Sequence, residues 1–444
     1  MRRRHLERIV VVGEAPVDEH AGPALRDHTG WLLHRLAQDG DGVWIDASTS
    51  KDDRALLTLE RALHGQLTRP VTHPSMWDGL EAASERTAAQ VLDRLDDRET
   101  LVYLRGSALA LLPRMLRSER SDLAITLRLP TPWPAPELFA RFPWRSELMR
   151  GAAGADVISL PGERDRKNLA RSFGRYLDDV GVAARKGALL HADGRRTRTL
   201  ANPPGVAVEE VLALSSGPAV DREVERWRDH LAGRSLVLTV DRQHASGGLL
   251  EQLAAIEQLL ERRADLHGQV AFLVVSSVTP TGSLGARRKL ESSIGRINGR
   301  FTLPGGPVPI EYLHGGVPGH VLGALYRLAD VLVVTPLLAG ATLAAKEYVL
   351  VQHAFDRPGR LVLSETSGTA TELPQVITCN PYDLAGIATA IAEALEADEQ
   401  LARRNLAAMV GRVRRHDVGA WWALERSVAE DPRRDITEGP TPTR

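Results

Sequence analysis

The stretch that most constrains how this chain folds covers residues 331–352 and reads VLVVTPLLAGATLAAKEYVLVQ. Its short, β-branched start, Val331–Val334, predicts a buried parallel strand. Pro336 and Gly340 then mark a turn, and apolar residues recur at helical spacing from Thr342 onward. A strand, a glycine-containing turn and a helix start together present backbone N–H groups that can bind an anion such as phosphate. The same pattern is also typical of ordinary sheet packing, so on its own it leaves both interpretations open.

The rest of the chain alternates between strand-like and helix-like segments. Ala88–Leu95 and Leu249–Arg262 are examples of the helix-like segments that separate the strands. Alternation of this kind predicts α/β domains with parallel sheets. The predicted strands are Ile9–Val12, Val43–Ile45, Leu101–Leu104, Ala124–Leu129, Val157–Leu160, Leu236–Val240, Val270–Val275, Ile310–Leu313, Val331–Val334 and Leu361–Leu363.

A segment rich in proline, glycine and serine, residues 201–218, is the predicted linker. Dividing the 444 residues there leaves two α/β halves, each long enough to bury a sizeable core. The composition, 43% apolar and 25% charged, is that of an ordinary globular protein. The tail after Asp431 is rich in proline, arginine and threonine, so we expect it to be disordered.

Charge, cysteine content and hydropathy exclude several classes of function. A net charge of −1 gives no reason to expect nucleic acid or an anionic membrane as a partner. The single cysteine, Cys379, excludes an intrachain disulfide framework and fits a reducing cytoplasm, where we expect the protein to be. No apolar run reaches the roughly 18 residues of a membrane helix, and the one near the N-terminus is too short for a signal peptide. The 14 histidines show no metal-binding spacing, so no metal is expected.

Residues 331–352 resemble the segment TPLRDGMNLVAKEYVACQ of the trehalose-6-phosphate synthase family of retaining glycosyltransferases. The likeness runs almost unbroken from about Leu236 to Trp422. Further segments look like that family's INGRF, YLH, LYRxAD, LVLSEFAG and RTHDV: here they read INGRF (297–301), YLH (312–314), LYRLAD (325–330), LVLSETSG (361–368) and RRHDV (414–418).

The resemblance implies a GT-B fold, with two Rossmann-like domains facing across a cleft that holds the active site. Residues 1–205 would form an acceptor-side domain and residues 206–400 a nucleotide-sugar domain. Residues 401–430 would be a C-terminal helix that returns to the N-terminal domain, with Trp421 and Trp422 packing there. Residues 431–444 would be the disordered tail.

On the donor side, the family's functional residues carry over only in part. Arg242 matches the family's diphosphate-binding arginine, but the lysine of the same motif falls on Gly247. Leu343 and Ala344 match the residues whose backbone N–H groups contact the diphosphate, and Glu347 matches the ribose-binding glutamate. The expected donor-binding residues are Arg242, Gly340, Thr342, Leu343, Ala344, Glu347, Ser364 and Glu365.

The positions that carry catalysis and acceptor binding in this family are replaced. The family's active-site histidine falls on Pro130, and the aspartate that hydrogen-bonds the donor sugar falls on Ala339, so no catalytic residue can be named. A methyl group cannot accept a hydrogen bond, which implies a different donor sugar or none. The family's first-loop arginine, which contacts the acceptor's phosphate, has no counterpart near Glu14. The expected acceptor-side residues are Arg105, Arg128 and Trp133, although each arginine could instead be solvated or ion-paired.

Two hypotheses about function follow. The first is a divergent retaining glycosyltransferase, resembling trehalose-6-phosphate synthase, that moves a sugar from a nucleotide sugar such as UDP-, GDP- or ADP-glucose to a small-molecule acceptor other than glucose 6-phosphate. Such enzymes need no protein nucleophile and no cofactor, because catalysis rests on positioning the substrates and stabilising the leaving diphosphate. The alternative is a catalytically inactive pseudoenzyme that acts as partner or regulator of an active synthase. Arg242 and Glu347 favour the first hypothesis, and Gly247 and Pro130 the second.

Overall fold

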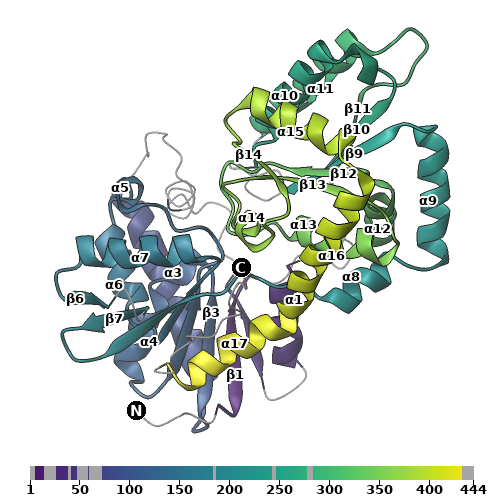
Figure 1. Ribbon diagram of the computed structural model, residues 1–444. Coiled ribbons are helices and arrows are strands. Elements are labelled where there is room, and N and C mark those ends of the chain that lie inside the picture. Colours follow the sequence, from purple (N-terminus) through teal and green to yellow (C-terminus); the bar gives the residue numbers. More distant parts are fainter. Residues whose placement is uncertain are drawn as a thin grey trace. The chain divides into compact units, whose positions relative to one another are not determined.

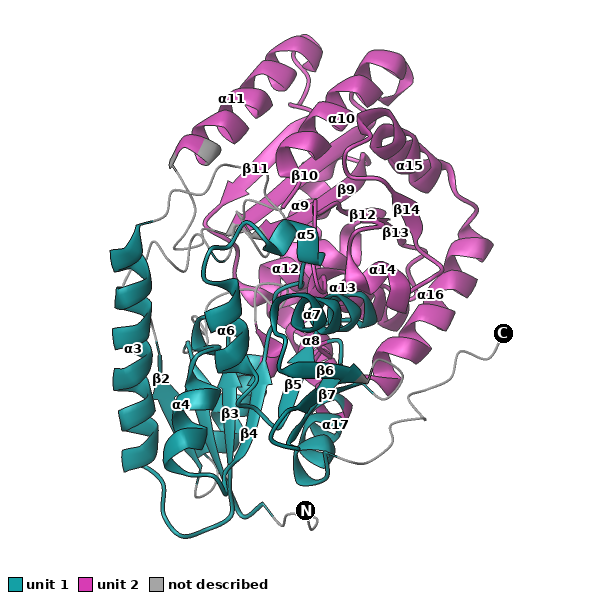
Figure 2. Ribbon diagram, turned by 90° about the vertical axis from the view of Figure 1, so that its left-hand side faces the viewer, with its two compact units in different colours: residues 1–16, 30–203, 421–444 teal, residues 17–29, 204–420 magenta. Residues whose placement is uncertain are grey.

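The computed structural model describes residues 6–14, 27–38, 42–47, 59, 73–183, 187–242, 247–277 and 284–432. The chain divides into two compact units (Figure 2). Unit 1 comprises Met1–Pro16, Gly30–Pro203 and Trp421–Arg444, and unit 2 comprises Val17–Thr29 and Pro204–Ala420. Among the described residues, no helix is both long and apolar enough to cross a membrane.

Unit 1 is built on an eight-stranded sheet in the order β2-β1-β3-β4-β5-β8-β7-β6 (Figure 1). The pairs from β2 to β8 are parallel, and β7 pairs antiparallel with both β8 and β6. The strands are β1 (Arg8–Gly13), β2 (Val43–Asp46), β3 (Thr100–Arg105), β4 (Ala124–Arg128), β5 (Val157–Leu160), β6 (Val180–Ala183), β7 (Ala188–His191) and β8 (Arg196–Ala201). The helices are α1 (His28–Gln38), α3 (Pro74–Asp93), α4 (Leu112–Glu119), α5 (Pro136–Phe139), α6 (Arg145–Ala152), α7 (Glu163–Tyr176) and α17 (Val418–Glu430), with a 3-10 turn at Ser107–Leu109. Of α1 and α17, only the residues from Gly30 and from Trp421 onward belong to unit 1.

The two faces of this sheet are covered by different helices. Val10 and Val12 of β1 belong to one buried apolar cluster with residues of α3, α4, α6 and α7. The opposite face packs against α17, whose Trp421 is fully buried. Trp422 also packs there, edge-on to Tyr103 of β3 at 5.6 Å between ring centroids. The expectation that these two tryptophans are packing residues is therefore confirmed.

Unit 2 is built on a six-stranded parallel sheet in the order β11-β10-β9-β12-β13-β14. Its strands are β9 (Ser235–Arg242), β10 (Val270–Ser277), β11 (Ile310–His314), β12 (Val331–Val334), β13 (Arg360–Ser364) and β14 (Ile377–Cys379). Its helices are α8 (Val208–Leu214), α9 (Pro218–Leu231), α10 (Leu249–Arg262), α11 (Leu284–Phe301), α12 (Gly319–Leu328), α13 (Leu343–Ala354), α14 (Gly368–Glu372), α15 (Leu384–Glu396) and α16 (Glu399–Arg415), with a 3-10 turn at Ala264–Leu266.

Alternating side chains of β9 place this second sheet between two layers of helices. Leu236, Leu238 and Val240 pack into a cluster with residues of α8, α9, α12, α13 and α16. Val237 points the other way, into a cluster with residues of α10, α11 and α15. Figure 1 shows these two groups of helices on opposite sides of the sheet. Strands buried on both faces read as continuous apolar runs, which is why the sequence pattern predicted them.

The strand orders fix where each unit can bind a ligand. In unit 2 the chain runs outward in opposite directions from β9 and β12, and in unit 1 from β1 and β3. In open α/β sheets, ligands bind at the carboxyl ends of the strands beside such a switch point. The edge formed by the ends of β9 and β12 and the edge formed by the ends of β1 and β3 are therefore the places to examine.

The structure contains all ten predicted strands and adds β6, β7, β8 and β14. The predicted linker, residues 201–218, is not an open connection, because it contains α8 with Val208 and Val211 buried. The units divide between Pro203 and Pro204. Within the segment expected to return to the N-terminal half, α16 belongs to unit 2, and residues from Trp421 onward belong to unit 1. Of the tail expected to be disordered, residues 433–444 lie outside the described part of the chain.

Candidate nucleotide-sugar site

The turn between β12 and α13 leads into a helix start that, among the described residues, has free backbone N–H groups at the switch point of unit 2. Thr342 is the N-cap of α13, and its side chain makes no capping bond. Within the described part of the chain, the N–H groups of Leu343 and Ala344 have no acceptor outside the helix. The first N–H groups of an α-helix also lack partners inside it. Two of the expected donor-binding residues thus offer backbone donors on a helix N-terminus, where negative charge is stabilised.

The start of this turn is held in place by hydroxyl groups at the end of β13 and just after it. Ser364 donates its Oγ hydrogen to the carbonyl of Pro336 at 2.7 Å, and Thr366 donates to the same carbonyl at 2.9 Å. Ser364 was predicted to bind the donor, but its hydroxyl group is hydrogen-bonded to the turn. Glu365, predicted beside it, has an exposed side chain. Its N–H donates to the carbonyl of Cys379.

The end of the turn is fixed by a close approach of two backbone segments. The N–H of Gly368 donates to the carbonyl of Ala339 at 3.0 Å, and that of Thr342 donates to Thr369 Oγ1 at 2.9 Å. A Cβ at Gly368 would lie 2.0 Å from the carbonyl oxygen of Gly340. Only glycine at position 368 permits this contact, so the predicted donor residues Gly340 and Thr342 owe their placement to a neighbouring loop.

Glu347, the expected ribose-binding residue, is fully buried, and both of its oxygens have protein partners. Its Oε1 lies 2.6 Å from Nε2 of His28, and its Oε2 accepts a hydrogen bond from the Tyr326 hydroxyl at 3.1 Å. Nδ1 of His28 accepts from the N–H of Ala207 at 3.4 Å. That bond leaves the ring proton on Nε2, where it is donated to the carboxylate. Burial, followed by the charge of Glu347, raises the pKa of Tyr326 well above its usual value.

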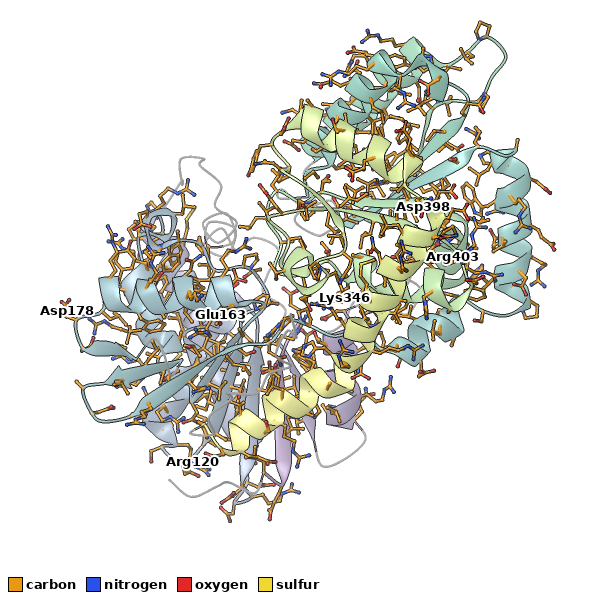
Figure 3. All side chains as sticks on the ribbon, in the orientation of Figure 1. Arg120, Glu163, Asp178, Lys346, Asp398 and Arg403 are labelled. Carbon is orange, nitrogen blue, oxygen red and sulfur yellow. The ribbon has the colours of Figure 1, made fainter. Side chains whose placement is uncertain are left out.

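The neighbouring Lys346 is a buried anchor of α13. Its Nζ donates to the carbonyl of Pro204 at 2.9 Å and to Glu372 Oε2 at 2.7 Å (labelled in Figure 3). The side chain is only 2% exposed. Lys346 therefore connects α13 to Pro204 and to α14. Because these groups occupy its ammonium group, Lys346 is not available to a phosphate.

The start of α10 meets the β12–α13 turn at the switch point. Gly248, the N-cap of α10, has φ +69°, and a Cβ there would lie 2.1 Å from the carbonyl oxygen of Thr335. The two segments therefore touch through backbone. Arg242 is the last residue of β9, beside Ser277 of β10. Its strand position is described, whereas its side chain lies outside the described part, so its predicted contact with the diphosphate stays a prediction.

In unit 1, Arg105 occupies the corresponding position at the switch point. It is the last residue of β3 and pairs with Gly13, the last residue of β1. A Cβ at Gly13 would lie 3.3 Å from the Cβ of Arg105, so the glycine makes room for this side chain. Arg105 is half-buried. Its position at the sheet edge fits the predicted acceptor-side role.

Arg128 is different, and its prediction as an acceptor-side anion binder needs correction. Its guanidinium is buried at the end of β4, where Nη1 donates to Ser159 Oγ at 2.8 Å and to the carbonyl of Asn202 at 2.8 Å. Glu425 Oε1 lies 3.6 Å away, and the ring of Trp421 lies beneath the guanidinium at 5.7 Å. Arg128 is therefore held by an internal network that joins the sheet to α17.

Glu425 is the centre of that network, and the sequence analysis did not identify it. Its Oε1 accepts from Ser159 Oγ at 2.5 Å and from Asn202 Nδ2 at 2.8 Å, and its Oε2 accepts from Tyr103 at 3.3 Å. The residue is 1% exposed. One signal was present: Trp421 and Val428 lie on the same helical face as Glu425, so a charged residue between them had to be buried.

Trp133 also departs from its expected acceptor-side role in unit 1. Trp133 is a core residue, 3% exposed, whose indole N–H donates to Ser172 Oγ at 3.2 Å. Its backbone N–H donates to Asp165 Oδ1 at 3.2 Å. Burial raises the pKa of that carboxyl to about 6. Pro130, which stands where the resemblance places a histidine, is exposed just after β4.

Two further observations limit the chemistry of the site. Across the residues that the structure describes, no three His, Cys, Asp or Glu side chains are grouped to hold a metal ion. Ala339, at the family's aspartate position, presents a methyl group and pairs through its backbone with Ser367. The described site therefore offers backbone N–H groups and one buried carboxylate.

Comparison with known proteins agrees with this arrangement. The sequence pattern of glycosyltransferase family 20 matches residues 58–429 of the chain. The chain belongs to glycosyltransferase family 20. The trehalose-6-phosphate synthase of Mycobacterium sp. strain KMS is 33% identical over 434 residues, which cover 95% of this chain and 86% of that one. The resemblance found in the sequence is thereby confirmed.

Solved structures of the same family have the same fold. An α,α-trehalose-phosphate synthase (UDP-forming) from Burkholderia xenovorans, in complex with glucose 6-phosphate, matches with a TM-score of 0.84 and 26% identity. The match covers 95% of this chain and 100% of that one. The α,α-trehalose 6-phosphate synthase of Burkholderia multivorans matches with a TM-score of 0.86 and 26% identity, over 96% and 97% of the two chains. The predicted fold class, GT-B with two Rossmann-like domains, is confirmed.

Proposed function

We propose that this member of glycosyltransferase family 20 transfers a sugar from a nucleoside-diphosphate sugar to a small acceptor other than glucose 6-phosphate. The observation that carries the proposal is the pre-organised helix start of α13, with the N–H groups of Leu343 and Ala344 at the switch point of unit 2. Donors fixed before the substrate arrives need no reorganisation when charge develops on a leaving diphosphate. No protein nucleophile or bound cofactor is required for that step.

Each donor-side residue has a defined task in this proposal. The diphosphate accepts hydrogen bonds from Leu343 and Ala344, and Arg242 supplies the planar guanidinium that suits phosphate oxygens. UDP is the first nucleotide to test, because a related Burkholderia synthase is UDP-forming. Glu347 accepts the ribose hydroxyls. Since its side chain is fully buried against His28 and Tyr326 in this structure, ribose binding requires one of these side chains to move aside.

The acceptor is proposed to differ from glucose 6-phosphate because cations expected for its phosphate are missing. The first-loop arginine of the family has no counterpart near Glu14, and the guanidinium of Arg128 is enclosed by protein groups. Arg105 remains as a cation at the switch point of unit 1. A neutral sugar or a singly charged acceptor fits one cation better than a phosphate dianion does.

Release of nucleoside diphosphate tests this proposal directly. The purified protein is incubated with UDP-, GDP- or ADP-glucose, each alone, with glucose 6-phosphate, and with neutral and carboxylated sugars. We expect one donor to release its diphosphate faster with a neutral or carboxylated sugar than with glucose 6-phosphate. Faster release with glucose 6-phosphate would overturn the acceptor assignment, and no release in any mixture would overturn the transferase assignment.

A second candidate function is a catalytically inactive partner or regulator of an active synthase. The observation that favours it is the closed network around Glu347, whose carboxylate already has a partner on each oxygen. Because the carboxylate is fully buried behind these side chains, a nucleotide reaches its oxygens only if His28 or Tyr326 moves aside.

Replacing His28 separates the two candidates. In the transferase, we take His28 as the partner that nucleotide binding displaces, and its hydrogen bond to the charged Glu347 is worth about 1.5–3 kcal/mol. His28→Ala should therefore bind the nucleotide about tenfold more tightly or better than the wild type. His34→Ala, an exchange of a histidine on the same helix, is the control. Equal or weaker binding by His28→Ala would contradict a ribose role for Glu347, and absence of binding by both proteins would favour the inactive partner.

A further inference from the structure

Unit 2 contains a cavity of about 450 Å³ at the edge of its sheet opposite to the candidate nucleotide-sugar site. It lies where Ser235 begins β9 and where Asp330 precedes β12, beside the last turns of α9 and α12. Figure 1 shows these two helices side by side on one face of the sheet. Because the sheet is parallel, the amino ends of the strands are a full strand length away from the carboxyl ends where the donor would bind.

Positive charge dominates the lining of this cavity. Arg228 of α9, Arg234 before β9, Arg327 of α12 and Arg357 after α13 contribute four guanidinium groups, against the single carboxylate of Asp330. A volume of this size is within the range of small-molecule sites, roughly 300–1,000 Å³. Three separate chain segments thus deliver four cations to one concave surface.

Several of these arginines are held in position by protein groups. The guanidinium of Arg327 lies 4.1 Å from the ring centre of Phe355 and donates to Asp221 at 2.7 Å. Arg357 lies 3.7 Å from Asp330 Oδ1. Cation–π and ion-pair contacts of this kind orient a guanidinium without using all five of its N–H donors.

Arg234 is the observation that points to a ligand. Its side chain is 6% exposed, Nε donates to the carbonyl of Leu231 and Nη2 to that of His230. These bonds satisfy the C-terminal carbonyls of α9, the ordinary task of a basic residue at a helix end. Nη1 is buried and has no hydrogen-bond partner among the described residues. A buried charged donor without a partner is costly in free energy, so its positive charge beside the cavity favours an anion there.

Arg228 supplies a second guanidinium with unused donors. It is exposed at the rim of the cavity and has no hydrogen bond or ion pair within the described part of the chain. Three nearby carboxylates each pair with one of the other arginines: Asp330 with Arg357, Asp221 with Arg327 and Glu311 with Arg234. Arg228 is then the cation left over for a ligand.

We propose that this cavity is an anion site for a small phosphorylated molecule, separate from the nucleotide-sugar site. A phosphate group is favoured over a carboxylate because its oxygens point in several directions and can accept from guanidinium groups on different segments. The phosphate of the ligand binds Arg228 and lies beside the buried charge of Arg234, and the rest of the molecule lies along Phe355 and the apolar side chains of α9.

Calorimetric titration with inorganic phosphate, glycerol 3-phosphate and acetate at constant ionic strength tests this site. We expect both phosphates to bind the full-length protein and acetate to bind at least tenfold more weakly. Tighter binding of glycerol 3-phosphate would identify an esterified ligand, and equal binding would identify free phosphate; either result supports the site. Absence of phosphate binding, or equally tight binding of acetate, would overturn the assignment.

Three variants test whether phosphate binds in this cavity. Arg228→Ala should weaken phosphate binding about tenfold, because one charge-assisted hydrogen bond is lost. Arg226→Ala, on the same helix and outside the lining, should leave it unchanged. Asp330→Asn removes the only lining carboxylate and should tighten phosphate binding, a gain that a damaged fold would not produce. An Arg228→Ala affinity equal to that of Arg226→Ala, or unchanged binding by Asp330→Asn, would contradict the proposal.

Discussion

At the scale of single residues, the structure separates buried charges that serve the fold from groups left for ligands. Arg128 and Glu347 both match positions that the sequence made candidates for binding. Arg128 is surrounded by carbonyl, hydroxyl and carboxylate oxygens of unit 1. Glu347 is paired with His28 and Tyr326. Sequence position could not reveal these partners, because they come from segments far away in the chain.

Removing the carboxylate of Glu425 should destabilise unit 1. Glu425→Ala would leave the guanidinium of Arg128 buried without its counter-charge, and breaking a buried pair in this way costs about 3–5 kcal/mol. Hydrogen exchange of the α17 amides in increasing urea measures the effect on this unit alone. Arg426→Ala, which breaks an exposed pair with Glu430 on the same helix, should cost less than about 1 kcal/mol. Equal costs for the two variants would contradict the role given to the network.

The raised pKa of Asp165 should make the stability of unit 1 depend on pH. Burial lifts the pKa of this carboxyl from an ordinary value near 3.8 to about 6, so the folded state holds a proton that the unfolded state has lost between these values. Its contribution is fully present below about pH 4 and is lost as pH rises through about 6. We expect the free energy of unfolding of Asp165→Asn to rise relative to that of the wild type by up to about 3 kcal/mol over that pH interval, as measured by urea unfolding at several pH values. A constant difference would contradict the shift.

At the scale of elements, the candidate site is a helix start whose geometry depends on one loop. The β12–α13 turn receives hydrogen bonds from Ser364, Thr366 and Gly368 and closes on the carbonyl of Gly340. The sequence predicted the strand, the turn and the helix, because their signals are local. It could not predict that the hydroxyl groups after β13 bind the turn instead of a ligand.

The close contact at Gly368 gives this element a direct test. Gly368→Ala would push a methyl group against the carbonyl of Gly340, so the turn has to shift, at a cost of about 1–3 kcal/mol. Gly295→Ala, in an open stretch of α11, meets nothing within 4 Å and should instead stabilise the protein by up to about 1 kcal/mol. Chemical denaturation of both variants measures the difference, and equal stabilities would contradict the close contact.

The missed strands show which local signals are weak. β14 has three residues, and β8 carries Arg196 and Arg198 in a short, mostly polar run, so neither reads as an apolar strand. One usable signal was overlooked. Asp193 and Gly194 lie between β7 and β8, and Gly194 has φ +81°, the pattern of a tight hairpin turn.

At the scale of the whole molecule, the structure has the architecture that the sequence pattern predicted. Both sheets are parallel where the alternating pattern indicated, and the sheet of unit 2 has the strand order typical of dinucleotide-binding folds. Fold class follows from many weak periodic signals that agree with one another. Function depends on a few side chains, such as those at Pro130, Gly247 and Ala339, where this chain departs from its family, so the periodic signals could not decide it.

Calorimetric titration with UDP, GDP and ADP and their glucose conjugates tests directly whether unit 2 binds a nucleoside-diphosphate sugar at the start of α13. We predict micromolar binding of one of them. Arg242→Ala should weaken it by about 1.5–3 kcal/mol, the worth of a charge-assisted hydrogen bond, while Arg262→Ala on the exposed end of α10 should not. Absence of binding by every nucleotide would contradict the claim.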